Sequence, residues 1–199
     1  SAVAFHEGRI WWAGKDKILG SVSDDFYNFD ETTVGDSGPI NRSIGSGPVD
    51  AFSWLLPLQR LVLGAQGAEF SCRSTSLDEP LTPTNFNLKP SSTQGSAPVG
   101  GIKIDSSGIY VQRGGTRVYQ LEIDAASYDY KSKHLSAVIP EIGRPGIVRA
   151  AVQRQPETRL HFIRSDGTVA MLTFDVNEEV TCWTEVETDG LIEDAVVLP

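Results

Sequence analysis

The sequence predicts an all-β fold, a β-propeller-like array of about four four-stranded antiparallel blades with a trailing strand. One observation is the hairpin pattern over 108–123, where two apolar runs flank Gly114 and Gly115, a pair suited to a tight turn. Another is that similar hairpins recur along the chain. Their first apolar residues are spaced 51, 48 and 51 residues apart: Ile10, Leu61, Ile109 and Leu160. This steady spacing, with strands in every unit, is typical of radial β-repeats.

The spacing divides the chain, as a single domain, into blade-like units at 1–48, 49–98, 99–145 and 146–190. The first unit is expected to hold strands at 2–6, 9–14, 17–22 and 26–29, with 40–44 as a further candidate and 30–39 as a loop. The second is expected to hold a strand at 49–56, a hairpin at 60–74 and an outer strand at 85–89. An excursion is expected at 75–84, which contains Pro80 and Pro83, and a surface connection at 91–98.

The third unit is expected to open at 99–104, continue through the hairpin at 108–123 and end with a strand at 128–131. Residues 135–142 are the one candidate for a short helix, which Pro140 and Gly143 would end. The fourth unit is expected to hold a strand at 146–152, a hairpin that turns at 165–168, and a strand at 180–186. Residues 191–199 resemble the first strand of a further blade. Either the chain is a fragment of a longer propeller, or this strand closes a ring beside the first unit.

The net charge of the chain argues against some classes of binding partner. The formal net charge of −9 argues against a general nucleic-acid-binding surface, which needs clustered Lys and Arg. Nine of the 17 basic residues fall between Arg113 and Arg164, and alternating solvent-facing strand positions explain them more simply than a basic strip. No run of 18 apolar residues occurs, so no membrane span is predicted. No signal peptide is visible, and the start at Ser1 indicates a processed chain or an expressed fragment.

Few residues in the sequence could bind a metal or form a disulfide. Cys72 and Cys182 lie in apolar strand contexts and are expected to be buried free thiols, with a long-range disulfide as the open alternative. His6, His134 and His161 fall in different units at unrelated spacings. No metal site and no cofactor are therefore predicted.

Some residue patterns in the sequence could serve catalysis or sugar binding. Asp24–Asp25 and Asp30–Glu31 flank an aromatic cluster at 26–29 and could pair as acid and base, although a polar turn is the favoured interpretation. The turn at 165–168 resembles part of the Asp-box of sialidases but lacks the aromatic residue that should follow, so a hairpin turn explains it. Four tryptophans could line a sugar-binding face, although core packing is favoured: Trp11, Trp12, Trp54 and Trp183. The sequence predicts a protein that is not an enzyme.

Four segments together resemble the β-propeller-type structural proteins of tailed-phage tails, which are common in prophages and related to tail tubular or nozzle proteins. The strongest is 5–14 followed by 23–29. The other three are 54–55 with 60–64 and 67–70, then 92–99 through 111–115, and finally Trp183 with 187–191. These segments are structural signatures that cover most of the chain.

The resemblance implies a structural protein of the virion tail, made in the cytoplasm of the bacterial host and assembled as a ring around the DNA path. Its partners would be other tail proteins and further copies of itself, with DNA only as passing cargo that an acidic channel repels. The candidate interaction residues are Asp24, Asp25, Phe26, Tyr27 and Asn28. The alternatives are a carbohydrate-binding or glycan-cleaving propeller module, and a propeller scaffold for host proteins.

Overall fold

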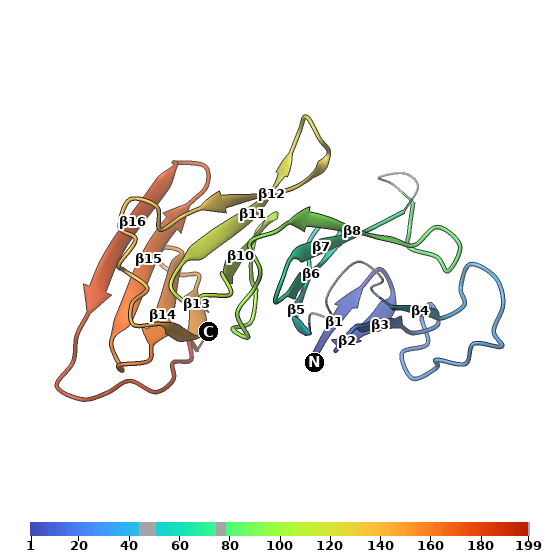
Figure 1. The fold of residues 1–199 in the computed structure, drawn as a ribbon, viewed down its shortest axis with the longest axis horizontal. Coiled ribbons are helices and arrows are strands. Elements are labelled where there is room, and N and C mark those ends of the chain that lie inside the picture. The colour runs from blue at the N-terminus through green and yellow to red at the C-terminus, as the bar shows by residue number, and fades with distance from the viewer. Residues whose placement is uncertain (44–50, 75–78, 199) are drawn as a thin grey trace.

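Four four-stranded antiparallel sheets follow one another along the chain and form an open arc (Figure 1). The computed structural model describes residues 1–43, 51–74 and 79–198. This part of the chain contains sixteen strands and no helix, so the predicted all-β array of four-stranded units is confirmed. None of its elements is a helix with the length and apolarity needed to cross a membrane.

Each sheet is a simple meander in which neighbouring strands pair in chain order. The first sheet contains β1 (Ala2–His6), β2 (Arg9–Gly14), β3 (Lys17–Gly20) and β4 (Ile40–Ser43). The second contains β5 (Phe52–Pro57), β6 (Leu61–Ala65), β7 (Glu69–Arg73) and β8 (Asn87–Ser92). The third contains β9 (Ile102–Ile104), β10 (Ser107–Val111), β11 (Val118–Asp124) and β12 (Asp129–His134). The fourth contains β13 (Ile147–Gln153), β14 (Arg159–Arg164), β15 (Val169–Asp175) and β16 (Val180–Val186).

The sheets pack face to face, and a separate apolar cluster fills each of the three interfaces. Trp11 of the first sheet packs with Leu61 of the second, and Trp54 of the second packs with Tyr110 of the third. Ile109 of the third sheet packs with residues of the fourth. A middle sheet therefore has two buried faces, which is why β6 and β10 are buried at every position. A terminal sheet has one covered face, and β2 alternates between buried and more exposed residues.

The first apolar residue of each predicted hairpin does not face the same way in every sheet. Leu61 faces the preceding sheet, whereas Ile109 faces the following one. When the strands are aligned by the face that they present to the following sheet, the equivalent residues are Trp11, Val62, Ile109 and His161. The spacing in the sequence therefore predicts where each hairpin lies. It does not predict which face of the sheet each residue occupies.

Two of the predicted elements are wrong because local hydrogen bonds close turns instead. Residues 26–29 are not a strand: the Val22 amide donates to the Asn28 carbonyl at 2.8 Å, and β4 takes the place beside β3. Residues 135–142 form turns rather than a helix. The Leu135 amide donates to the Val118 carbonyl at 3.0 Å, which continues the pairing of β11 with β12 by one residue past His134.

Two connections also differ from expectation. Ser91 and Ser92 belong to β8, and Ser96 and Ala97 are buried rather than on the surface. The Ser96 amide bonds to β6 and the Ala97 amide to β10, so this segment links the second sheet to the third. The predicted positions 44, 49–50, 75–78 and 199 lie outside the described residues.

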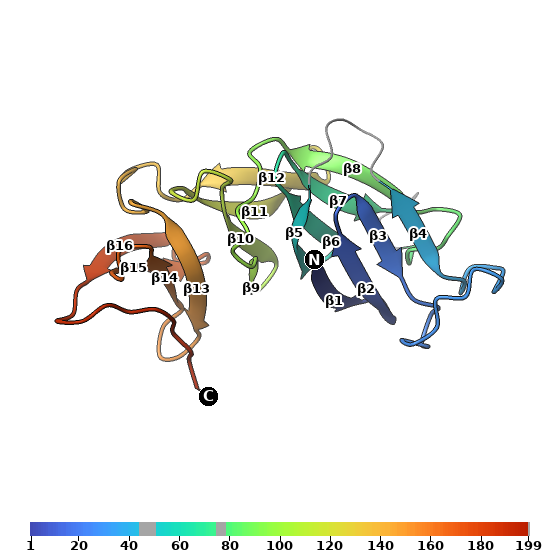
Figure 2. The same cartoon turned by 60° about the horizontal axis from the view of Figure 1, so that its bottom comes forward.

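The predicted trailing strand does not form within the described residues. Residues 191–198 are extended but belong to no sheet, and the Ile192 amide donates to the Gly167 carbonyl of the fourth sheet at 2.9 Å. Asp194 pairs with Arg149 of β13 at 3.5 Å. This tail therefore lies against the fourth sheet and does not pair beside the first. Figure 2 shows the arc open, with the first and fourth sheets at opposite ends.

Candidate interaction surface

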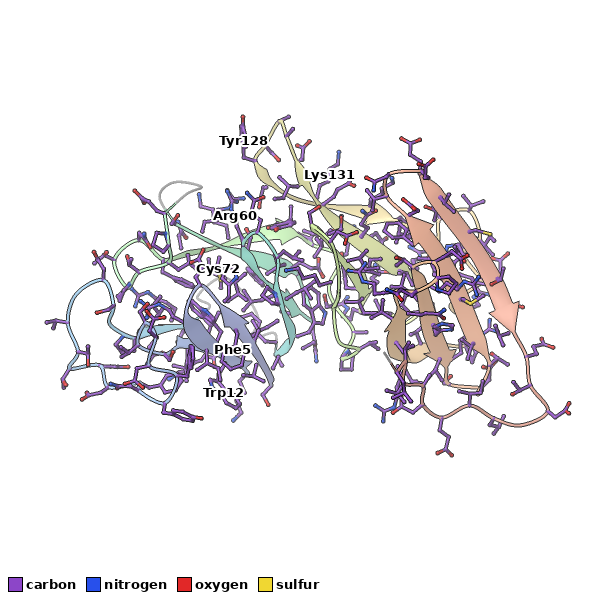
Figure 3. The ribbon with its side chains drawn as sticks, turned by 180° about the vertical axis from the view of Figure 1, so that it is seen from behind. Phe5, Trp12, Arg60, Cys72, Tyr128 and Lys131 are labelled. Carbon is purple, nitrogen blue, oxygen red and sulfur yellow. The ribbon has the colours of Figure 1, made fainter. Side chains whose placement is uncertain are left out.

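The first sheet carries an exposed apolar face, here called the aromatic face, made by Val3, Phe5 and Trp12 with the adjoining Phe26. Phe5 is 63% exposed, Val3 50% and Trp12 47%. Val3 lies directly across from Trp12 in the register of β1 and β2. The Phe5 and Phe26 rings meet edge to face with their centroids 5.3 Å apart. Figure 3 shows Phe5 and Trp12 near each other on this sheet, far from Tyr128 at the tip of the β11–β12 hairpin.

The two neighbouring tryptophans show why this face is open. Successive side chains of a strand point to opposite sides of the sheet. Trp11 points toward the second sheet, is fully buried, stacks on Phe86 and donates its indole N–H to the His6 carbonyl at 3.1 Å. Trp12 points the other way, where the described chain provides no further sheet. Exposed apolar groups gathered on one face mark an interaction site more often than isolated ones do.

The predicted interaction segment, Asp24 to Asn28, lies at the edge of the aromatic face. Its backbone forms a tight turn in which the Asn28 amide donates to the Asp25 carbonyl at 3.3 Å, and the Asp24 amide donates to the carbonyl of Gly8, between β1 and β2, at 2.8 Å. Phe26 reaches the face through its contact with Phe5, and Tyr27 is 97% exposed. The structure thus brings one aromatic residue of the segment onto the face. Asp24 and Asp25 are exposed beside it.

A buried arginine holds this turn and the long loop after it in place. Arg9 is 2% exposed, and its guanidinium donates to the carbonyls of Gly38 at 2.6 Å and Asp36 at 2.8 Å. It also donates to the Ser21 carbonyl. Burial lowers the pKa of Arg9, and the carbonyl oxygens supply the acceptors that a buried cation needs. This one side chain fixes three points of the loop between β3 and β4.

The other predicted carboxylates have local partners. Asp30 accepts a bond from the Thr32 amide at 2.9 Å, and this bond lowers the pKa of Asp30. Glu31 accepts from the side-chain amide of Asn41 at 2.8 Å. The Asp30 contact lies within the loop itself, whereas the Glu31 contact ties the loop to β4.

The three histidines lie in three different sheets. His6 belongs to β1, His134 stacks on Tyr119 with centroids 4.7 Å apart, and His161 bonds to Gln153 at 3.2 Å. Burial lowers the pKa of all three. Within the described residues, no group of three or more His, Cys, Asp or Glu side chains is placed to hold a metal ion.

The face of the sheet on which each cysteine and each remaining tryptophan lies determines whether it is buried. Cys72 is a buried free thiol, as predicted, and burial raises its pKa. Cys182 is free but exposed, so the prediction of its burial is wrong, as is the alternative disulfide. The reason is that Trp183 occupies the inward side of β16 and donates to the Leu135 carbonyl at 3.1 Å, which leaves Cys182 on the open side. Trp54 is 2% exposed, so it packs in the core.

The turn at 165–168 forms the predicted hairpin connection. Asp166 accepts bonds from the Thr168 amide at 3.1 Å and hydroxyl at 2.6 Å, and the hydroxyl bond lowers the pKa of Asp166. Arg164 donates to the same hydroxyl at 2.6 Å and pairs with Glu185 of β16 at 2.7 Å. These contacts connect β14 and β16 with the turn that precedes β15.

A polar cluster between the second and third sheets was not anticipated from the sequence. Asp129 pairs with Arg73 and lies 3.9 Å from Arg60, and it accepts bonds from the hydroxyls of Ser71 and Ser91, each at 3.1 Å. These residues come from the connection between β5 and β6 and from β7, β8 and β12, so only their meeting in space reveals the cluster. It fixes β12 against the neighbouring sheet through a shared carboxylate.

A second polar group, Glu69, is fully buried in the same interface. Its carboxylate accepts a bond from the Ser96 hydroxyl at 2.7 Å. Burial raises the pKa of Glu69, against the opposing effect of hydrogen bonds from Ser96, Ser92 and Tyr110. Ionising a carboxyl group in a buried place costs free energy. The stability of this interface should therefore depend on pH through Glu69.

A comparison with models of protein families gave no match, and a comparison with curated proteins gave no significant match.

Proposed function

We propose that this protein is a non-enzymatic structural component of a phage or prophage virion tail, acting through contacts with other tail proteins and with copies of itself. The observation that carries the proposal is the aromatic face, where Val3, Phe5 and Trp12 are about half exposed or more. Such a face costs free energy in water, roughly 25 cal/mol for each Å² of apolar surface, and a protein partner would recover it. The tail assignment itself rests on the resemblance of the four sequence segments.

The shape of the molecule supports a role in assembly. Four rigidly packed sheets present a terminal apolar face at one end of an open arc (Figure 1). The loop that borders this face is held by the buried Arg9, so the surface is formed before a partner arrives. A preformed surface loses little conformational entropy on binding.

The experiment that tests the tail assignment is mass spectrometry of virions purified from the bacterial strain that carries the gene. Peptides of this chain should appear in the tail fraction, and an antibody to the chain should label tails in electron micrographs. A non-structural protein of the same phage is the matched control and should be missing from the particles. Purified virions that lack the chain would contradict the assignment.

A carbohydrate-binding module is the second candidate, because exposed aromatic rings such as Trp12 and Phe5 can also stack on sugars. A glycan array separates the two proposals. Glycan binding that disappears in a Trp12→Ala variant would favour the sugar-binding function. The tail proposal predicts that the array stays negative.

A further inference from the structure

A cleft of about 430 Å³ opens between the third and fourth sheets, where β11 and β12 approach β15 and β16 (Figure 1). Its lining includes Gln120 and Glu122 of β11, Lys133 of β12, and Phe174 and Asp175 of β15. The volume lies within the range of about 300–1,000 Å³ that is usual for small-molecule sites. The residues of the aromatic face do not line this cleft, so the two surfaces are separate.

The polar lining follows from the alternation of side chains along β11. Val118 packs in the apolar cluster between the third and fourth sheets. Gln120 and Glu122 come two and four residues later, so they lie on the same side of the strand. Along β11 the apolar packing against the fourth sheet therefore ends at Val118, and polar side chains follow it.

Three carboxylates line the cleft: Glu122, Asp175 and Glu179. Among the described residues, none of the three takes part in an ion pair. Lys133 is the basic residue of the lining, and three carboxylates against one ammonium leave a net charge of −2. Two bordering residues of opposite charge leave this value unchanged: Lys131, directly across from Glu122, and Glu178, next to Glu179.

Gln120 adds a buried hydrogen-bond acceptor to this acidic lining. The residue is 3% exposed, and its Nε2 donates to the Ser107 hydroxyl at 3.1 Å. No residue in the described part of the chain donates a hydrogen bond to its Oε1. A buried amide oxygen is stabilised by a donor, so this position suits a ligand that carries N–H groups.

The lining selects an organic cation over a metal ion. Within the described residues, no three carboxylate, His or Cys side chains are placed around one point that could hold a metal ion. Phe174, which is 5% exposed, and Val176 give the cleft an apolar part as well. Apolar side chains suit the methylene groups of a ligand, while the carboxylates suit its ammonium groups.

We propose that this cleft binds a linear aliphatic polyamine, a ligand in which ammonium groups are joined by methylene chains. The ammonium groups donate to the carboxylates and to Oε1 of Gln120, and the methylene chain lies against Phe174 and Val176. A diamine carries two positive charges, which match the net charge of the lining. This binding activity is independent of the aromatic face and of the tail assignment.

Isothermal titration calorimetry of the whole chain with spermidine, at physiological salt, tests the proposal. One spermidine should bind per chain. Replacing Glu122 and Glu179 together by Gln should weaken binding at least about 10-fold, because two charge-assisted hydrogen bonds are lost. Lys133→Gln should instead tighten binding, since it removes a competing positive charge. Glu187→Gln combined with Glu193→Gln removes the same charge from exposed positions elsewhere, so this matched control should bind normally.

Two further titrations define the ligand. Butylamine, which carries a single ammonium group, should bind at least about 10-fold more weakly than 1,4-diaminobutane, because it leaves one carboxylate contact unmade. Magnesium at the same concentration should not displace spermidine. Thermal unfolding verifies that every variant is folded. Glu179→Gln alone, at an exposed position, keeps the test available if the double variant is unstable.

Several results would overturn the proposal. Binding that does not saturate, or equal weakening in the two double variants, would show that spermidine responds only to the net negative charge of the protein. Weaker binding by Lys133→Gln would contradict the assigned repulsion. Displacement of spermidine by magnesium would assign the cleft to a metal ion. None of these results depends on whether the protein is found in virions, so this inference and the tail assignment can fail separately.

Discussion

At the scale of single residues, the side of the sheet decides what a side chain does, as Trp11 and Trp12 show. Replacing Trp11 by Ala should cost about 3–5 kcal/mol of unfolding free energy, because it leaves a cavity between two sheets. Replacing Trp12 by Ala should cost about 1 kcal/mol or less, since the side chain is 47% exposed. Urea denaturation measures both values. Equal losses would show that Trp12 is part of the core and not of a free surface.

Glu69 should make the stability of the fold depend on pH. In the unfolded chain its carboxyl titrates at the ordinary pKa of 4.5, whereas burial raises the pKa in the folded protein. Between these two values the folded protein holds more protons, so stability falls as the pH rises through this window and the full loss persists above it.

Glu69→Gln should therefore raise the melting temperature more at about pH 8 than at about pH 4, because the amide stays neutral and still accepts the Ser96 bond. Thermal unfolding at both values measures the effect. Glu187→Gln, at an exposed position directly after β16, is the control and should change neither melting temperature. The same shift in Glu69→Gln at both pH values would contradict the assigned burial cost.

At the scale of elements, the close approach of sheets depends on residues that lack a side chain. A Cβ atom on Gly64 of β6 would lie 2.1 Å from the Trp54 ring, so Gly64→Ala must displace the indole from the interface with the third sheet. We expect a loss of about 1–3 kcal/mol, the usual cost of overpacking, together with a change in tryptophan fluorescence. Gly100→Ala meets no atom within 4 Å and should be neutral. Equal stability of the two variants would contradict the packing described for Trp54.

The hairpins could be predicted from the sequence because their signals are local. Gly114 with Gly115, and Asp166 with Gly167, mark turns between apolar runs whatever the rest of the chain does. The failed helix at 135–142 shows the limit of local signals. There Leu135 is held by a backbone bond to Val118, a partner that only the folded sheet brings near.

The candidate surface could be predicted only in part. Phe26 was named from the sequence and does adjoin the aromatic face, because it follows directly after the first hairpin. Trp12 was considered for a sugar-binding face but core packing was favoured, and Phe5 was not singled out, since a strand residue in a repeat looks like core until the position of its sheet in the array is known. Asp129 with Arg60 and Arg73 was missed for a similar reason, because the three residues lie far apart in the sequence and meet only when the second and third sheets pack together.

At the scale of the whole molecule, the net negative charge should weaken binding of the protein to DNA. With a net charge of −9, the chain should not retard duplex DNA in a mobility-shift assay at physiological salt, because few counterions can be released. This behaviour suits a protein past which DNA slides, as proposed for the tail. A charge-reversed variant with several surface Glu replaced by Lys is the positive control. Salt-sensitive binding by the unmodified chain would instead indicate that its basic residues gather on one surface.

The central claim is that the aromatic face of the first sheet is a protein-binding surface, and hydroxyl-radical footprinting tests it most directly. The side chains of Phe5 and Trp12 should react readily in the dilute chain and become protected when the protein is assembled, either in concentrated solution or in purified particles. Tyr128, on the distant hairpin, should react equally in both states. Unchanged reactivity of Phe5 and Trp12 in the assembled protein would contradict the account.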